Sequence, residues 1–420
     1  MTQENSTEQV TSREDVLAYP FPMADHSLEL ADPTVYERLH AECPVARVRM
    51  PVGGEAVLLT RHGDVVQALT NPHVGTVQIS DGDIPRRGRG RGPGTGNEMA
   101  SLFSVSDARH NQIRRLVTQW FTVKTANALA PRVVEVTNDL VDTMERKGPP
   151  ADLFEDYAIK TPMTVICELL GVPSEDEPLF RQWARVLFSI ETLPEEASAQ
   201  RREMVQYLLP LMEEEQKQPR NNMMGTLVKA HEQGDDVLTQ EEMLSFAMGL
   251  IIAGFETVST TFTNSAFILF QRPDLLAQLR EHLDDPEHLA TSIEEILRIT
   301  PLGAGGRPRI ARDDVELGGT CIRKGEFLVL DSRAANHDPS IFSNAQEVDF
   351  ERDPNPQITF GRGIHACLGQ QIARMELRVL WNTLLKRLPT IRLAVPPSEV
   401  LWRPADSATT GPAQLPVTWG

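Results

Sequence analysis

The order of hydrophobic and polar residues along this chain is mostly that of helices. An apolar pattern with helical spacing runs from about Thr239 to about Gln271 and stops before Pro273, which gives the longest predicted helix. Its first residues, Thr239-Gln240-Glu241-Glu242, are those of a capping box, so we expect the helix to begin there. A helix this apolar is expected to cross the core rather than lie on the surface.

Other segments predict shorter helices and a few strands. Cap residues followed by apolar periodicity predict helices at Thr34 to Leu39, Gly63 to Leu69, Ser106 and Asp107 through Trp120, about Glu195 through Met212, Thr291 to before Pro301, and after Gly369. A capping box at Ser174-Glu175-Asp176-Glu177 predicts the start of another helix. Alternating or glycine-bounded segments predict strands at Val45 to Met50 and Ala56 to Thr60, paired as a hairpin, and at Val315 to Leu317 and Cys321 to Leu330. The chain is therefore predicted to be mostly α with a small β region and short C-terminal strands.

The domain organisation follows from where this periodicity begins. Residues 1–18 lack it and are expected to be a disordered arm. Residues 19–420 contain no repeat and no convincing linker, so we expect a single domain.

Composition narrows the class of protein. The net charge of −18 opposes binding to nucleic acid or an anionic membrane. The run from Arg86 to Gly96 resembles an RNA-binding arginine–glycine segment, but it has no aromatic residues, so a solvated loop is favoured. Four separated cysteines, no signal peptide and no bilayer-length apolar run (the longest is Met248 to Phe255) predict a cytoplasmic protein.

Candidate chemistry concentrates in the stretch Phe-Gly-Arg-Gly-Ile-His-Ala-Cys-Leu-Gly-Gln-Gln-Ile-Ala-Arg, residues 360–374. It places Cys367 between a loop and a helix. Gly361, Gly363 and Gly369 allow positive φ angles around the cysteine and let a flat group approach the backbone. The helix N-terminus points back at the sulfur, which favours a thiolate.

A thiolate in this position has several possible roles. His365 lies only two residues away, and catalytic partners usually come from distant segments. No second Cys or His stands at a zinc-ligand spacing. A single thiolate suits haem iron, while the alternative is an inert buried cysteine.

The stretch resembles the haem-binding loop of the cytochrome P450 monooxygenases, whose pattern is Phe-Gly-x-Gly-x-His-x-Cys-x-Gly followed by Ala-Arg. Every fixed position is matched, and the likeness is to the soluble bacterial, actinomycete-like branch. The resemblance implies a cytochrome P450 fold that encloses haem b (iron protoporphyrin IX), with the Cys367 thiolate as axial ligand. The residues implied to bind the cofactor are Cys367, His110, Arg114, Arg309, His365, Phe360, Gly361, Gly369 and Ala373.

Two of these residues also carry an argument from spacing. His110 and Arg114 lie four apart on one helix face, which suits two cations that hold one carboxylate. In the family this pair binds a haem propionate, Arg309 matches the second propionate arginine, and His365 commonly assists. The alternative for each is a solvated surface charge.

The long helix contains Ala253-Gly254-Phe255-Glu256-Thr257, which matches the family's oxygen-activating motif. A carboxylate in such an apolar stretch is costly unless it has a partner or a role. By the resemblance, Thr257 hydrogen-bonds the iron-bound peroxo group and Glu256 helps to relay protons to it. The alternative is that Thr257 bonds back to the carbonyl of Ala253 and that Glu256 turns to solvent.

Glu295-Ile296-Leu297-Arg298 places opposite charges at i and i+3. It resembles the family's Glu-x-x-Arg signature, a buried ion pair that braces the cysteine loop with a third basic residue. Arg352 is the candidate third member, although Glu347-Val348 stands where many relatives have arginine and phenylalanine. Glu295 could instead close a capping box with Ser292.

The resemblance also predicts the reaction. It implies insertion of one atom of O2 into a C–H or C=C bond of an organic molecule, often a secondary metabolite. Small residues fill the substrate-contacting segment Leu302 to Gly306, which predicts a roomy pocket and a bulky substrate. Residues 80–100 and the region Phe188 to Met212 are the expected lid. Oxidative coupling or ring formation by the same haem is an alternative, and a haem-binding sensor without turnover is another.

Electrons are expected from a ferredoxin and a separate ferredoxin reductase, since no flavin or iron–sulfur motif occurs in the chain. By the family match, Arg114, Arg115, Arg362 and Arg374 lie on the side of the haem that faces an acidic partner. We expect a monomer that binds no nucleic acid and no membrane.

Overall fold

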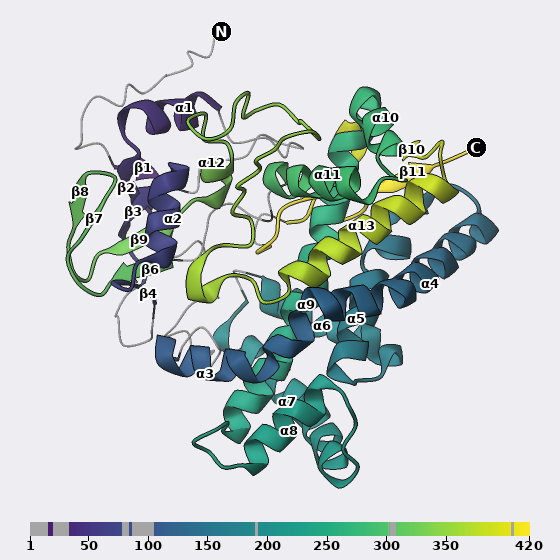
Figure 1. Cartoon of the computed structure of the whole chain (residues 1–420), viewed down its shortest axis with the longest axis horizontal. Coiled ribbons are helices and arrows are strands. Elements are labelled where there is room, and N and C mark those ends of the chain that lie inside the picture. The colour runs from purple at the N-terminus through teal and green to yellow at the C-terminus, as the bar shows by residue number, and fades with distance from the viewer. Residues whose placement is uncertain are drawn as a thin grey trace.

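Helices dominate the structure; the main sheet lies on one side of it, and β10 and β11 lie on the other side, near the C-terminus (Figure 1). The computed structural model describes residues 16–19, 33–77, 84–85, 105–189, 192–300, 302, 308–404 and 407–420. The helices are α1 (Pro33–Glu42), α2 (His62–Thr70), α3 (Asp107–Val117), α4 (Val123–Lys147), α5 (Lys160–Leu170), α6 (Glu177–Phe188), α7 (Pro194–Lys217), α8 (Met223–Glu232), α9 (Gln240–Phe270), α10 (Pro273–Glu281), α11 (Pro286–Ile299), α12 (Ser332–Asn336) and α13 (Gln370–Arg387). The expected mostly α class with a small β region is confirmed.

The strands form one main sheet and two small ones. They are β1 (Leu17–Ala18), β2 (Val45–Arg49), β3 (Glu55–Leu59), β4 (Val74–Thr76), β5 (Ala151–Asp152), β6 (Pro308–Ala311), β7 (Val315–Leu317), β8 (Thr320–Ile322), β9 (Phe327–Leu330), β10 (Arg392–Leu393) and β11 (Pro416–Thr418). The main sheet has the order β1-β2-β3-β9-β6-β4, and the predicted β2–β3 hairpin is confirmed. Strand β6 pairs with β9 and carries Arg309 opposite Leu328, so the sheet fixes this arginine.

Helix α9 runs through the middle of the helical region (Figure 1). Its predicted start is confirmed, because Thr239 and Glu242 form a complete capping box. The buried residues of its first half, up to Phe255, pack with α5, α6, α7 and α8, whereas those from Val258 onward pack with α10, α11 and α13. The segment 253–257 therefore lies where two hydrophobic clusters meet.

By length and composition α9 could also cross a membrane, but most of its apolar window is buried inside the protein. A core helix satisfies the same criteria, so this finding is weak evidence for a membrane span.

Two predicted helix starts are wrong. Ser174–Asp176 form a 3-10 turn rather than a capping box, and α6 begins after them at Glu177 with a proline in its first turn. Proline is favoured in the first turn, where its missing N–H is not needed, so the helix starts there. Helix α11 begins at Pro286 and not near Thr291, because the Asp285 side chain accepts the N–H groups of residues 287 and 288.

Several predictions fall outside the described residues. These are residues 1–15 of the predicted arm 1–18, the arginine–glycine segment 86–96, the substrate-contacting residues 303–306, and the first expected lid apart from residues 84–85. At the end of that arm the predicted disorder is wrong, because Leu17–Ala18 form β1 and pair with β2.

Candidate active site

The cysteine loop, residues 360–369, is shaped by two glycines in the left-handed region. Gly361 has φ 69° and Gly363 has φ 72°. A Cβ on Gly363 would lie 2.5 Å from the carbonyl oxygen of Leu69, so the loop rests directly on α2. Gly369 has φ −79° and is the N-cap of α13, so the expectation of a positive φ is wrong there. Nothing lies within 4 Å of the place where its Cβ would be.

The sulfur of Cys367 lies at the N-terminus of α13. The backbone N–H groups of Gly369 and Gln370 donate hydrogen bonds to it, and the loop is closed by a bond of 2.7 Å from the N–H of Cys367 to the carbonyl of Phe360. Cys367 is exposed in the structure.

Burial sets the protonation of this thiol. It raises the pKa of Cys367 above its usual value, while the two N–H groups, Arg114 and Arg374 lower it by less. The N–H groups, Arg114 and Arg374 thus favour the thiolate, as the sequence indicates, while burial opposes them. The thiolate is expected when a cation binds and displaces the proton.

Basic side chains from three distant segments gather around this loop. Helix α3 brings His110 and Arg114, strand β6 brings Arg309, and His365 comes from the loop itself. The rings of His110 and His365 lie 4.3 Å apart between centroids. Arg114 Nη1 donates to the carbonyl of Ala366 at 2.7 Å, so α3 is attached to the residue next to the cysteine.

The surroundings of this cluster disfavour the protonated form of both histidines. Desolvation, followed by the charges of His365 and Arg114, lowers the pKa of His110 to about 4. Desolvation also lowers the pKa of His365, with contributions from Arg309 and Arg114, and a hydrogen bond to Asp107 of 3.2 Å opposes this effect. The buried Nδ1 of His110 has no hydrogen-bond partner among the described residues. Such a cluster could hold an anionic group.

One face of α9 is open although the helix lies in the core. Gly249 and Ala253 are exposed and Thr257 is partly exposed, and these residues are four apart, so they lie along one line of the helix. Gly254 does not belong to this line. A Cβ on it would lie 2.8 Å from the Ile166 side chain, so Gly254 permits close packing of α9 against α5. The sequence grouped Gly254 with the catalytic residues, and the structure places it in this helix contact.

The two candidate residues for proton transfer have different partners. The Thr257 hydroxyl donates to the carbonyl of Ala253 at 3.1 Å, which is the back-bonding alternative. Glu256 does not turn to solvent. Its Oε1 accepts a hydrogen bond of 2.5 Å from Arg403. Nothing in the sequence marked Arg403, because the two residues are 147 positions apart.

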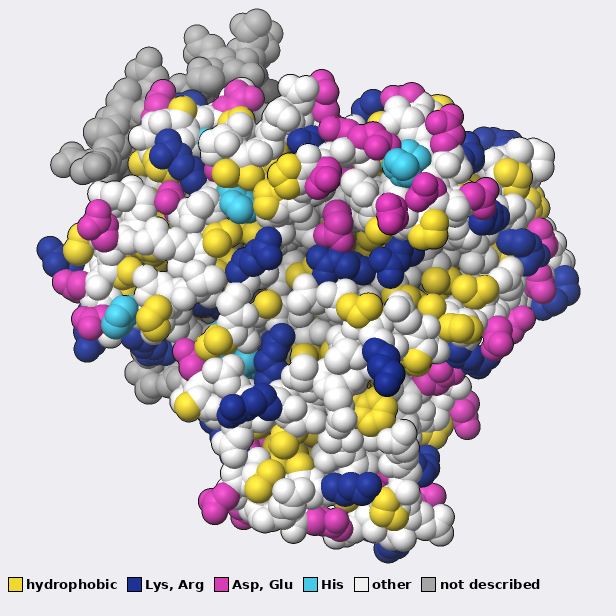
Figure 2. All heavy atoms as spheres, viewed as in Figure 1, with side chains coloured by type: hydrophobic (Ala, Val, Ile, Leu, Met, Phe, Trp, Pro, Cys, Tyr) yellow, Lys and Arg dark blue, Asp and Glu magenta, His cyan; other side chains and the backbone are white. Residues whose placement is uncertain are grey.

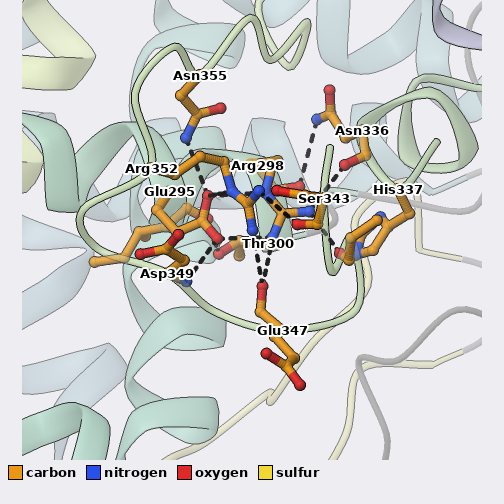
Figure 3. Close-up of polar contacts among 12 residues, drawn as sticks. Glu295, Arg298, Thr300, Asn336, His337, Ser343, Glu347, Asp349, Arg352 and Asn355 are labelled. Carbon is orange, nitrogen blue, oxygen red and sulfur yellow. Dashed lines mark hydrogen bonds and ion pairs between the residues drawn. The ribbon is translucent and has the colours of Figure 1, made fainter. Parts of the chain in front are cut away.

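Glu295 and Arg298 of α11 form a fully buried ion pair (Figure 3). Arg298 Nε and Nη2 donate to the two carboxylate oxygens at 2.8 and 2.7 Å. Arg352 Nε lies 3.1 Å from Glu295 Oε2 and is the third member of this group, here called the buried ion network. The alternative capping box is not formed, since the Ser292 hydroxyl donates to the carbonyl of His288.

The buried ion network holds the backbone that leads to the cysteine loop. Arg298 donates to the carbonyl oxygens of Asn336, Ala345 and Glu347 at 2.9, 2.7 and 2.8 Å (Figure 3). Glu347 thus contributes a backbone atom, so its departure from the family pattern leaves the network intact. Asn336 in turn accepts the N–H of Ile358, two residues before the loop begins.

The remaining loop residues pack the cysteine helix. The guanidinium of Arg374 lies 4.6 Å from the centre of the Phe360 ring and is paired with Glu294 of α11 at 2.5 Å. Ala373 lies in the first turn of α13, with its N–H bonded to the carbonyl of Gly369. In the part of the chain that the structure describes, no three His, Cys, Asp or Glu side chains gather to hold a metal ion.

Comparisons with known proteins agree with this geometry. The family model described as Cytochrome P450 matches residues 173–397. Nocardicin C N-oxygenase of Nocardia uniformis subsp. tsuyamanensis is 38% identical over 415 residues, 97% of this chain and 100% of the relative. Mycinamicin IV hydroxylase/epoxidase of Micromonospora griseorubida is 39% identical over 406 residues, 96% of this chain and 98% of the relative.

A solved structure shows the same fold. The crystal structure of cytochrome P450mel 107F1 with biaryl coupling reactivity superposes with a TM-score of 0.85 at 34% identity, over 96% of this chain and 100% of the other. Family proteins carry haem bound through a thiolate and use O2, an organic substrate and redox partners. This chain therefore belongs to the cytochrome P450 family, among its bacterial monooxygenases.

Proposed function

We propose that this protein holds haem b through Cys367 and inserts one atom of O2 into a C–H or C=C bond of a bulky secondary metabolite. The observation that carries the proposal is the gathering of two arginines and two histidines beside the cysteine loop. His110, Arg114, Arg309 and His365 gather beside the one sulfur that backbone N–H groups point at. A thiol beside two arginines and two histidines suits a ligand with a metal centre and carboxylate arms.

The residues fit that ligand. The unpaired Nδ1 of His110 and the neighbouring Arg114 would bind one propionate, with Arg309 and His365 at the other. Gly369 presents no Cβ at the open side of the sulfur. The bound haem would supply the activation of O2.

Thr257 and Glu256 would handle the protons for the reaction. Thr257 Oγ1 lies on the open line of α9, and the small side chain of Ala253 one turn away leaves space beside it. The hydroxyl is a donor and an acceptor, so it can give up its bond to the Ala253 carbonyl and donate to oxygen on the open side. Glu256 would supply protons to that turn from solvent.

The electron donor would be a ferredoxin reduced by a separate reductase. Figure 2 shows Lys and Arg side chains across the middle of the face in front of α13 and the loop before it. Arg115 and Arg362 are exposed there, whereas Arg374 is partly exposed and paired with Glu294. An acidic ferredoxin would be attracted to this face.

The test is the absorption spectrum of the purified protein after dithionite and carbon monoxide, with the Cys367→Ser variant as control. A strongly red-shifted Soret band in the wild type that the variant lacks is expected. No haem, a histidine-type band, or a thiolate band retained by the variant would contradict the assignment of Cys367. Extraction of the cofactor and mass spectrometry then identify haem b.

The substrate is tested by titration with a panel of natural products that includes mycinamicin IV and nocardicin C, the compounds in the relatives' names. A ligand that shifts the spin state is then turned over with a surrogate ferredoxin. A product that gains one oxygen supports the monooxygenase. The solved relative with biaryl coupling reactivity favours a second outcome, a product that has lost two hydrogens. Binding without any product would favour the sensor.

A further inference from the structure

The C-terminal segment places a buried arginine against the acid of the α9 motif. Arg403 Nη1 donates to Glu256 Oε1 at 2.5 Å, to Thr260 Oγ1 at 2.8 Å and to Thr409 Oγ1 at 2.5 Å. Glu256 and Thr260 are one turn apart on the same side of α9. The arginine therefore bonds both the acid and the next turn of the same helix face.

Two further contacts, with Gly411 and Phe154, hold the arginine in place. Its backbone N–H donates to the carbonyl of Gly411 at 3.0 Å, in an antiparallel contact next to the Trp402–Pro412 bridge. Its guanidinium lies 4.9 Å from the centre of the Phe154 ring, in a π-helical turn before α5. Only 9% of its side chain is exposed, so the guanidinium is largely shielded from water.

The two oxygens of Glu256 are not equivalent. Oε1 accepts from Arg403 and, at 3.4 Å, from Thr409. Oε2 has no hydrogen-bond partner among the described residues, and 15% of the side chain is exposed. One oxygen is thus fixed by donors that do not release their protons at neutral pH, while the other is free to exchange a proton with solvent.

We propose that Arg403 is a positioning residue for proton delivery: it fixes Glu256 through Oε1 so that Oε2 takes up a proton from solvent and releases it toward Thr257. The inference rests on the proposed function, since it needs a reaction that consumes protons. One proton enters and one leaves at the same oxygen, so the carboxylate is regenerated in each cycle. Without Arg403 the carboxylate rotates away from this turn and the transfer slows.

The test compares haem-loaded Arg403→Met, which keeps the length of the side chain without charge or donors, with Arg403→Lys. NADPH consumption with O2, a plant-type ferredoxin and its reductase, and no organic substrate, is followed in H2O and D2O. For Arg403→Met we expect a decrease of about tenfold to a hundredfold, as for other misplaced catalytic groups, and a larger solvent isotope effect. Arg403→Lys should recover most of the rate.

The decisive control is a double variant. If Arg403 acts through Glu256, Arg403→Met adds nothing to the effect of Glu256→Gln on rate and isotope effect, whereas independent effects add. Hydrogen exchange of residues 253–260 in the holoenzyme reports the loss of the contacts between Arg403 and α9, independently of turnover. Faster exchange with unchanged rate and isotope effect, or additive effects in the double variant, would overturn the proposal.

Two further results keep the interpretation definite. If Arg403→Met loses the thiolate spectrum, the Thr409→Val variant is tested in its place. An isotope effect in Thr409→Val equal to that of the wild type would also overturn the proposal. A wild type without a thiolate–haem spectrum would instead refute the proposed function, so the two failures are distinguishable.

Discussion

Replacing Arg298 with methionine should destabilise the protein far more than the loss of one charge on the surface. The substitution removes two donor bonds to Glu295 and three to backbone carbonyl oxygens. The carboxylate keeps Arg352, the N–H of Asp349 and the amide of Asn355 as donors at 3.1, 2.9 and 3.0 Å. Removing one partner of a buried pair costs about 3–5 kcal/mol, and the remaining donors place this case near the lower end.

The matched control is Arg132→Met on α4. Arg132 also bonds two carboxylates, Glu168 at 2.8 Å and Glu135 at 3.2 Å, but its side chain is 49% exposed. Exposed pairs contribute about 0–1 kcal/mol because water and salt screen them. Urea unfolding followed by circular dichroism measures both variants against the wild type. The expected difference between them is about 2 kcal/mol or more.

Equal losses of stability in the two variants would refute the argument that burial makes this pair costly to break. The triple variant Glu295→Leu, Arg298→Met and Arg352→Met sharpens the result, because it removes all three charges, and apolar replacement of a whole buried ion group is often tolerated. It should regain only part of the stability. The carbonyl oxygens that Arg298 bonds stay without their donor, and each buried unsatisfied group costs about 1–3 kcal/mol.

Three other substitutions are expected to separate function from stability. Thr257→Ala should release more peroxide and form less product per NADPH, and unchanged coupling would contradict its role in proton delivery. Gly363→Ala should lower the thermal midpoint and speed haem loss, because its Cβ would meet an α2 carbonyl at 2.5 Å with φ 72°, whereas Gly63→Ala, with nothing within 4 Å, should not. Burial lowers the pKa of His337 to about 4. Since this lies below the unfolded value of about 6.5, the stability that neutral His337 contributes is complete above pH 6.5 and is lost toward pH 4. His337→Asn should flatten this slope in unfolding measured at pH 7 and pH 5, by up to ~2 kcal/mol.

Local sequence signals predicted helix boundaries where one signal dominated. Thr239 to Glu242 formed the capping box that their types predict. At Ser174 the same spacing failed because Pro178 offers a competing start one turn later. The true start of α11 had a readable signal, the Asp285-Pro286 pair, since an aspartate before a proline is a strong N-cap combination.

The candidate site was predictable only in part. The cysteine loop, the His110 and Arg114 pair, and the Glu295 and Arg298 pair are local patterns. The structure places His110 and Arg114 beside the cysteine loop and joins Glu295 and Arg298 to Arg352. The partner of Glu256 was not readable, because Arg403 reaches it through a contact between distant segments. The burial that raises the pKa of Cys367 was not readable either, since it depends on the whole fold rather than on neighbouring residues.

The buried ion network holds this part of the chain through hydrogen bonds to backbone carbonyl oxygens. Arg298 bonds the carbonyl of Glu347 and Arg352 bonds the carbonyl of Ser343, while the side chains of Glu347 and Ser343 lie on the surface. A carbonyl oxygen is the same in every amino acid, so substitutions at these two positions leave the hydrogen bonds from Arg298 and Arg352 unchanged. The exposed side chains of this segment can therefore be substituted during evolution while its backbone path into the cysteine loop stays the same.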